Sequence, residues 1–408
     1  MPEPGQVSVL TQSNGRLSNR FNQQAAPYFD NPFYFAKIVN DYNSSFLNPW
    51  FGDYGMLVFF GGGHAATNDN SVVGLILGES SRFVRLVDPS PIKGTGTDEA
   101  TIMANIFENG TAFANDGWGD AVVDQRPISP HSYGSGDILG PGYGGAEHGT
   151  FMRVVSGAGG VGGGVAAEAA HRLDFNRLDG EANGPNPGYQ WQRVARKSGA
   201  AFNMAAFNNI GPPQWSAFVP AQGRVYYATR NSRPQRWFDL TTSSYAEGRG
   251  AGLTADADGP DNGILFHVPE RELLIFMDRF GGKLRARICP VNNADPSWDN
   301  AGVAFSRTLD IDLGWSCACW CTDNGRILVG DVLADNAAVF EIKIPVRLSD
   351  PWPVERAPFA AGQRIAFAQS TTYKKWSYNP QLRAIVYMPL ASAQASDDTV
   401  YVYRPRGT

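Results

Sequence analysis

The feature that most constrains the fold is a strand–turn–strand unit that recurs at intervals of about 50 residues from position 215 onward. In each copy a short apolar stretch leads into a turn at Pro, Gly or Asn, and a more strongly apolar strand follows. The copies span 215–230, 264–279, 317–331 and 375–389, with third strands at 236–240, 283–289, 337–343 and 399–404. Antiparallel units of this size are typical of the blades of a β-propeller.

The first half of the chain contains two looser copies of the same unit. One runs through 48–64, 71–77 and 82–87, and the other runs from 131–139 through 149–157 to Trp191 and Val194. The sequence therefore predicts an all-β, six-bladed propeller with insertions at about 93–126 and 157–188. A seventh, degenerate blade within 93–126 is the alternative.

Composition supports this fold class and excludes others. Charged residues make up 18% of the 408 residues, aromatic residues 12%, and there are 46 glycines. Bundles of long helices are excluded because they are rich in Ala, Glu, Lys and Leu. The net charge of −5, with no run of Lys or Arg, argues against a nucleic-acid partner.

Closure of the ring requires an outer strand for the last blade, because an open propeller leaves an unpaired edge. The last predicted strand, 399–404, lies almost at the end of the sequence, so its neighbour must come from elsewhere. The aromatic segment FYFAKIV at 33–39 is the predicted partner. The sequence thus predicts an N-terminal arm over 1–32, polar in composition, and a propeller over 33–408.

One region resembles a known family. The segments MLVFFGGGH (56–64), SVVGLIL (71–77), RFVRLVDPSP (82–91) and PISPHSYGS (127–135) are similar to bacterial kelch-type, galactose-oxidase-like propellers. The resemblance implies the propeller fold. It implies no activity, because propellers carry many unrelated functions.

Polar residues are predicted to gather at one mouth of the channel. Loops that join second and third strands lie on the same face as loops that join consecutive blades, and converging polar groups at a concavity suggest a binding site. The residues concerned are His64, His131, Arg230, Asp278, Arg279 and Asp331. The alternative is that these charged groups only end strands and face water.

A weaker candidate is a calcium site in the loop TADADGPDNG. Asp256, Asp258 and Asp261 are closely spaced on a glycine-rich loop, and Ca²⁺ binds hard oxygen ligands. The bidentate Glu that usually closes such a loop is missing at the expected distance. A solvated turn is therefore the favoured interpretation, and no cofactor is expected.

Two further patterns favour structural roles. Cys317, Cys319 and Cys321 alternate along one strand, which favours buried packing over zinc or a disulfide. A G-x-G-x-x-G pattern at Gly157, Gly159 and Gly162 is followed by Asp174 and Asp179 but not by the second apolar strand of a dinucleotide site, so we interpret it as a loop.

The sequence gives little support to hypotheses of enzymatic activity. A copper radical oxidase, which the resemblance suggests, would need a loop Cys beside a Tyr, and no Cys lies in such a place. A serine hydrolase would show a G-x-S-x-G elbow, which is absent. His267 alternates with apolar residues along a strand and is predicted to be a packed core residue.

The function predicted from the sequence is a non-enzymatic binding or assembly module. The N-terminal residues lack the apolar core of a secretory signal, and no apolar stretch is long enough to span a membrane. Synthesis in the cytoplasm combined with an outward-facing recognition fold suggests a phage virion protein. Its partners would be protein subunits of an assembly or a surface glycan. The alternative is an enzyme acting on carbohydrate or a small molecule at the channel mouth.

Overall fold

The computed structural model describes the sheets and most of the short turns of the chain. The described residues are 1–10, 44–60, 71–79, 81–87, 118, 125–127, 135–143, 146–158, 165–178, 188–197, 214–229, 235–254, 263–309, 317–331, 338–360, 362–363, 365, 373–388 and 400–408. Among them, no helix has the length and apolar character needed to cross a bilayer.

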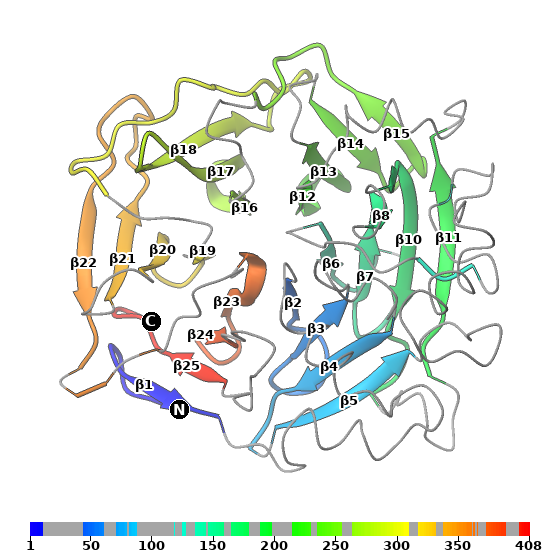
Figure 1. The fold of residues 1–408 in the computed structure, drawn as a ribbon, viewed down its shortest axis with the longest axis horizontal. Coiled ribbons are helices and arrows are strands. Elements are labelled where there is room, and N and C mark those ends of the chain that lie inside the picture. Colours follow the sequence, from blue (N-terminus) through cyan, green and yellow to red (C-terminus); the bar gives the residue numbers. More distant parts are fainter. Residues whose placement is uncertain are drawn as a thin grey trace.

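Six antiparallel sheets surround a central channel, each with its first strand innermost, so the fold is a six-bladed β-propeller, as predicted (Figure 1). Blade 1 consists of β2 (Ser45–Asn48), β3 (Met56–Phe60), β4 (Val72–Ile76) and β5 (Arg82–Val87). Blade 2 consists of β6 (Asp137–Leu139), β7 (Thr150–Arg153), β10 (Ala169–Asp174) and β11 (Trp191–Arg196). Blade 3 consists of β12 (Gln214–Val219), β13 (Arg224–Thr229), β14 (Arg236–Asp239) and β15 (Ser244–Glu247).

The second half of the ring follows the same plan. Blade 4 has three strands, β16 (Ile264–Val268), β17 (Leu273–Phe280) and β18 (Lys283–Pro290). Blade 5 consists of β19 (Cys317–Cys321), β20 (Arg326–Asp331), β21 (Ala338–Lys343) and β22 (Val354–Pro358). Blade 6 consists of β23 (Trp376–Asn379), β24 (Ala384–Tyr387), β25 (Tyr401–Tyr403) and β1 (Val7–Val9).

Proline marks the turn after the inner strand and explains why the hairpins form there. In blades 3 and 4 a 3-10 turn begins at Pro220 (η2, Pro220–Gln222) and at Pro269 (η4, Pro269–Arg271). Proline suits this first position because its φ is already fixed and its missing N–H is not needed. The turns end in left-handed residues, Gly223 at φ 61° and Glu272 at φ 47°. Each donates its N–H to the proline carbonyl, which fixes the reversal.

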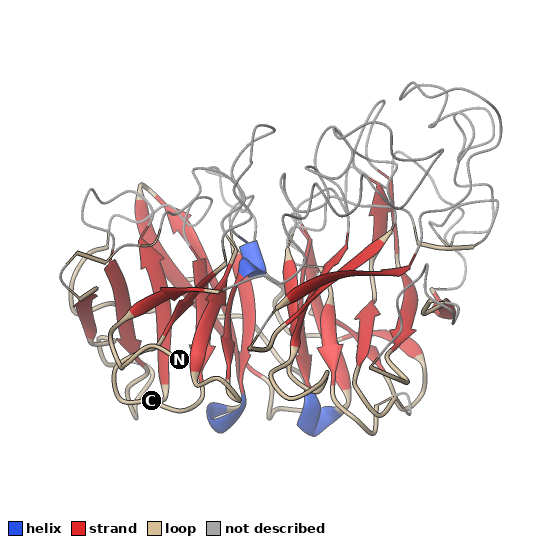
Figure 2. Cartoon of the chain, turned by 90° about the horizontal axis from the view of Figure 1, so that it is seen from below, coloured by secondary structure: helices blue, strands red, loops and turns tan. Residues whose placement is uncertain are grey.

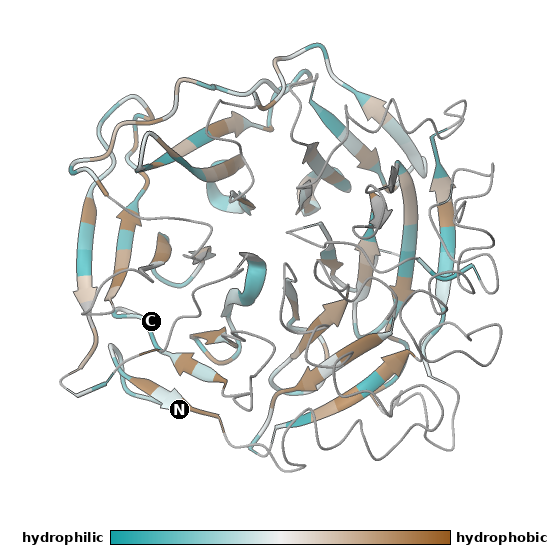
Figure 3. Ribbon diagram, viewed as in Figure 1, coloured by the Kyte–Doolittle hydropathy of each residue, from teal (hydrophilic) through white to brown (hydrophobic). Residues whose placement is uncertain are grey.

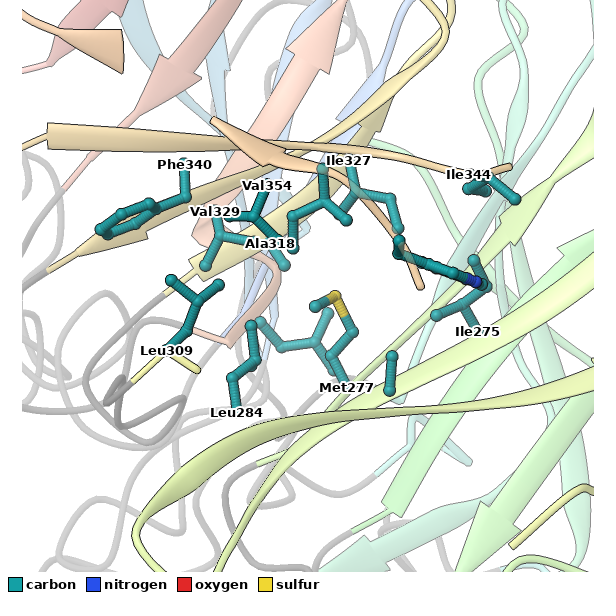
Figure 4. Packing of buried hydrophobic residues seen from close by; sticks show 14 of the residues in the cluster. Ile275, Met277, Leu284, Leu309, Ala318, Ile327, Val329, Phe340, Ile344 and Val354 are labelled. Carbon is teal, nitrogen blue, oxygen red and sulfur yellow. The ribbon is translucent and has the colours of Figure 1, made fainter. Parts of the chain in front are cut away.

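The core lies between neighbouring blades. The middle strands carry the most apolar sequences, whereas the outer strands are mixed (Figure 3). Between blades 4 and 5, Ile275 and Met277 of β17 pack in one cluster with Ile327 and Val329 of β20 (Figure 4). All four are fully buried, so each contributes about 1.5–3 kcal/mol of burial free energy.

The strand that closes the ring is β1, and the prediction of residues 33–39 for this role was wrong. Val7 pairs with Tyr403 and Val9 with Tyr401, while the other edge of β25 pairs with β24. Both edges of β25 are therefore occupied. The predicted arm over 1–32 consequently contributes a strand to the propeller, and residues 33–39 themselves lie outside the described residues.

Blade 2 also differs from its predicted layout. Its third strand, β10, lies inside the segment 157–188 that we predicted as an insertion. The inserted part that the structure describes is a small hairpin of β8 (Ser156–Ala158) and β9 (Val165–Ala167). Gly157 belongs to this hairpin. The alternating residues AAHRLD gave only a weak strand signal, because one face of β10 carries Arg172 and the buried His171 lies on the other.

Candidate functional site

The inner strands of all six blades line one central cavity of about 550 Å³. This volume falls within the range of small-molecule sites, about 300–1,000 Å³. Each inner strand contributes residues along its length, from Ser45 to Leu47 in β2 and from Trp376 to Tyr378 in β23. The cavity is therefore a property of the ring as a whole.

One end of the cavity is formed by the turns that follow the inner strands. The prolines of these turns line it in five of the six blades: Pro49, Pro141, Pro220, Pro269 and Pro380. Three aromatic residues, Trp50, Tyr143 and Trp320, lie at the same end. Trp50 is 40% exposed. Its ring packs on Gly140, where a Cβ atom would approach within 2.8 Å of it.

Two of these aromatic rings are held by hydrogen bonds that cross between neighbouring blades. The Tyr143 hydroxyl of blade 2 donates to the carbonyl of Pro220 in blade 3, at 2.6 Å. The Trp320 indole of blade 5 donates to Glu270 Oε2 in blade 4, at 3.0 Å. The polar atoms of both rings are thus already used, which leaves flat apolar faces beside the cavity.

The opposite end of the cavity is crossed by Lys374. This residue belongs to η5 (Tyr373–Lys375), a hydrophilic turn at the centre of the ring that lies on the face away from η2 and η4 (Figures 2 and 3). Its Nζ donates to Gly136 O at 2.9 Å, Asp137 Oδ1 at 3.2 Å and Ser216 O at 2.6 Å. Lys374 therefore ties blade 6 to blades 2 and 3, and all three ammonium protons are used.

Burial shifts both members of the Lys374–Asp137 pair. Desolvation raises the pKa of Asp137, and the attraction of Lys374 with hydrogen bonds from Ser216 and Phe218 offsets part of that rise. Desolvation likewise lowers the pKa of Lys374, and Asp137 offsets part of that change. Three acceptors around Lys374 favour the ammonium form, so the pair is best described as an ion pair.

Four buried polar atoms of the cavity lining have no hydrogen-bond partner among the described residues: Ser45 Oγ, Asp137 Oδ2, His267 Nε2 and the Tyr378 hydroxyl. Asp137 Oδ1 accepts from Lys374 and from the Phe218 amide at 3.2 Å, whereas Oδ2 has no partner among the described residues. His267 Nε2 likewise finds no partner within the described part of the chain. Desolvation lowers the pKa of His267 to about 4, so the imidazole is neutral at pH 7. A buried polar atom without a partner costs free energy, and each of these atoms has almost no surface open to the cavity.

The predicted polar mouth is described only in part. His64, His131 and Arg230 lie outside the described residues, as do the calcium candidates Asp256, Asp258 and Asp261. Asp278 and Arg279 lie within β17, which continues to Phe280, and do not follow the strand as the repeat suggested. Asp278 is buried and pairs with Arg285 and Arg287 inside blade 4, Arg279 is exposed, and Asp331 is the last residue of β20.

Sequence reasoning missed the cavity residues at both ends. Asp137 and Lys374 are far apart in sequence, and neither belongs to a recognisable motif. One signal in the sequence could have located one end of the cavity. A proline follows the inner strand in five blades, and these prolines line that end. His267, which we predicted to be a core residue, is only partly buried and lines the cavity.

Cys319 and Cys321 are buried, as predicted, and Cys289 is buried as well, whereas the side chain of Cys317 lies outside the described part of the structure. Cys289, Cys319 and Cys321 carry free thiols. Burial raises the pKa of Cys321 to about 11 and that of Cys289 to about 12, which keeps both thiols protonated and unreactive at pH 7.

Comparison with known proteins gives distant matches of fold. No protein family matches the chain, and no curated protein matches it in sequence. Its structure is similar to TolB from Acinetobacter baumannii, with a TM-score of 0.35 and 9% identity over 74% of this chain and 51% of that one. The chain thus spans about half the length of that TolB structure.

Two further structures resemble it over most of their length. The allergen Mala s 1 from Malassezia sympodialis has a TM-score of 0.43 and 7% identity, covering 90% of this chain and 93% of its own. An auxiliary nutrient binding protein from Bacteroides ovatus has a TM-score of 0.33 and 9% identity, covering 88% and 97%. At these TM-scores the matches carry no argument about function, and the fold is established by the chain's own sheets.

Proposed function

We propose that the protein is a binding module that takes a small ligand into the central cavity. The observation that carries the proposal is the central cavity of about 550 Å³, which is lined by the inner strands of all six blades. Rigid inner strands surround it, so the site is preformed and a ligand would not have to order it. Preformed apolar cavities with a few directed polar groups are typical of ligand sites.

Binding is favoured over hydrolysis of a glycoside. Such hydrolysis needs two carboxyl groups on either side of the scissile bond. Among the described residues that line the cavity, Asp137 is the only carboxylate, and it is engaged by Lys374. This argument favours the non-enzymatic form of the function that the sequence predicted over its enzymatic alternative.

The experiment is a ligand-observed NMR screen of small neutral, acidic and basic compounds against three proteins. Ser377→Phe places a ring in the cavity, because Ser377 is a half-buried residue of its lining. Ser244→Phe is the matched control on β15, where Ser244 is exposed. We expect hits that bind the wild type and Ser244→Phe and lose binding to Ser377→Phe. Hits that bind all three proteins equally, or no hits, would contradict the proposal.

The finer forms of the function rest on the sequence. A kelch-type, galactose-oxidase-like lineage is supported by the segments over 56–135, and service in a phage virion is proposed from the resemblance to recognition propellers. In that role the partners would be subunits of the particle. A gene position beside capsid or tail genes, and detection of the chain in purified particles, would support this form; a position within a catabolic gene cluster would argue against it.

A further inference from the structure

The wall of the central cavity is apolar in five of the six blades. Each of these blades contributes a large apolar side chain of its inner strand to the lining: Leu47, Ile138, Phe218, Phe266 and Trp320. All five side chains are half-buried, so part of each remains open beside the cavity. We call these five side chains the apolar wall. Apolar surface of this kind, gathered in a concave place, is typical of ligand sites.

The apolar wall is held in place by the core behind it. Phe266 and Trp320 pack against the cluster of buried residues between blades 4 and 5. Leu47, Ile138 and Phe218 pack against the clusters between blades 6 and 1, 1 and 2, and 2 and 3. Side chains that are already fixed offer packing surface without the entropic cost of ordering them when a ligand binds.

The charges of the cavity cancel, which disfavours an ionic ligand. Lys374 and Asp137 are the only Lys, Arg, Asp or Glu side chains among the described lining residues, and they pair with each other. A charged ligand would therefore find no opposite charge that is not already paired. Binding it would require breaking the Lys374–Asp137 pair in a poorly solvated place, which is strongly unfavourable.

The neutral polar side chains of the described lining are largely occupied as well. The Tyr143 hydroxyl and the Trp320 indole donate to neighbouring blades, as described above. Ser377 Oγ donates to the carbonyl of Lys374 at 2.9 Å, and Trp376 Nε1 donates to a carbonyl of blade 5 at 3.2 Å. The four polar atoms without a partner have almost no surface open to the cavity. A polar ligand would lose hydrogen bonds to water and gain few in return, whereas an apolar ligand has none to lose.

We infer that the central cavity binds a neutral, apolar small molecule, which packs on the apolar wall. This inference rests on the proposed function and names the chemical class of its ligand. The driving force is the removal of apolar surface from water on both partners. The ligand enters at the turn end, where Trp50 is exposed, because Lys374 crosses the opposite end.

The test compares two fluorescent probes that share one ring system. N-phenylnaphthylamine is neutral, whereas anilinonaphthalene sulfonate carries a negative charge on the same rings. We expect the wild type to bind the neutral probe and to bind the sulfonate about tenfold more weakly or worse, because its charge would find no unpaired cation in the described lining. Ser377→Phe, which fills part of the cavity, should abolish binding of the neutral probe, and Ser244→Phe on β15 should leave it unchanged.

A second variant should reverse the preference between the probes. Ser377→Lys adds an unpaired ammonium group to the cavity lining. It should weaken binding of the neutral probe about tenfold and strengthen binding of the sulfonate by a similar factor. Ser244→Lys, the matched change at an exposed position, should alter neither affinity. A damaged fold would change the binding of both probes in the same direction, so the reversal reports on the cavity itself.

Folding of each variant is checked by its melting temperature and near-ultraviolet circular dichroism before binding is compared. No binding of the neutral probe by the wild type, equal or tighter binding of the sulfonate, or full binding of the neutral probe by a folded Ser377→Phe variant would each overturn the inference. If the Ser377 variants fail to fold, Phe266→Gln should weaken binding of the neutral probe about tenfold, and unchanged affinity would overturn the inference. If acidic or basic compounds still depend on an open cavity while the neutral probe does not bind, the proposed function stands and only the apolar assignment fails.

Discussion

Asp278 in blade 4 and Asp137 in blade 2 are both buried carboxylates that bond cationic side chains. Their partners differ, because Asp278 bonds within one sheet and Asp137 bonds across the channel. Asp278 Oδ1 accepts from Arg285 Nε at 3.0 Å, and Oδ2 accepts from Arg285 Nη2 at 2.5 Å and from Arg287 Nη2 at 2.7 Å. Both of its oxygens are therefore satisfied within one sheet. Asp137 has one oxygen satisfied across the channel and one that faces no described partner.

The difference teaches which buried charge to examine for function. Asp278 stood out in the sequence because it comes at the end of an apolar run, but its bonds hold β17 to β18. Asp137 stood out in no way, and its importance comes from the ion pair with Lys374, which joins blades 2 and 6 across the channel. A charge pair between two blades is the more informative observation, because it forms only when distant parts of the chain come together at the cavity.

The largest effect should come from Asp278→Asn. Arg287 is fully buried and would lose the charge of Asp278, and a buried pair that loses one member costs about 3–5 kcal/mol. The free energy of unfolding in urea measures this loss. As a control, the folded fraction should bind any cavity ligand with unchanged affinity. A stability loss below about 1 kcal/mol would contradict the structural role that we assign to Asp278.

An intermediate effect should come from acidification, through His267. Burial lowers its pKa to about 4, below the usual value of about 6.5, so protons bind preferentially to the unfolded chain. The stability that this residue contributes is fully present above pH 6.5 and is lost as the pH falls towards 4, by about 3 kcal/mol at most.

The measurement is the free energy of unfolding at pH 7 and at pH 4.5, for the wild type and for His267→Gln. The variant should lose part of the pH dependence, while Asp278→Asn should retain it. Identical pH dependence in the wild type and His267→Gln would mean that the imidazole is well solvated, and would weaken its assignment to the cavity site.

The smallest effect should come from Asp239→Asn, a third carboxylate that is partly exposed. Its Oδ1 accepts from the amides of Thr241 and Thr242 at 3.0 and 3.1 Å. Burial raises its pKa, but hydrogen bonds from Thr242 and Arg224 outweigh that effect and leave the pKa below its usual value. An amide oxygen keeps the backbone contacts, so we expect a loss below about 1 kcal/mol in urea unfolding. A larger loss would contradict the expectation that replacing this partly exposed carboxylate costs less free energy of unfolding than replacing a buried one.

Much of the fold could be predicted because its signals are local. Each hairpin is encoded by fewer than 20 residues that form an apolar stretch, a turn and a second apolar stretch. The recurrence of this pattern along the chain therefore predicts the six blades. The closing strand could not be found in this way. Val7–Val9 is half-buried or exposed, and an outer strand of three residues needs little hydrophobicity. The more apolar segment 33–39 was therefore preferred.

The cavity chemistry could be predicted much less well, because it depends on distant partners. Lys374 and Asp137 meet only after six blades have closed into a ring, and no spacing along the chain encodes that contact. The residue types gave no help either, since most Lys and Asp residues face water. The prolines at the turn end could be recognised in the sequence repeat as turn residues, but not as residues that line a cavity.

The pairing of β1 with β25 has a consequence for how the chain is made. On the ribosome, Val7–Val9 emerges before the strands of blades 1 to 5 and its partner Tyr401–Tyr403 after them. The hydrogen bonds that close the ring therefore wait until β25 has been made, while blades 1 to 5 have all their strands beforehand. Until then the outer edge of β24 has no strand beside it, and blade 6 is held to blade 1 only by side-chain contacts such as Val386 with Leu57. A chain permuted to begin at β2 and to carry β1 after β25 would form blade 6 from neighbouring segments, and should close without that delay.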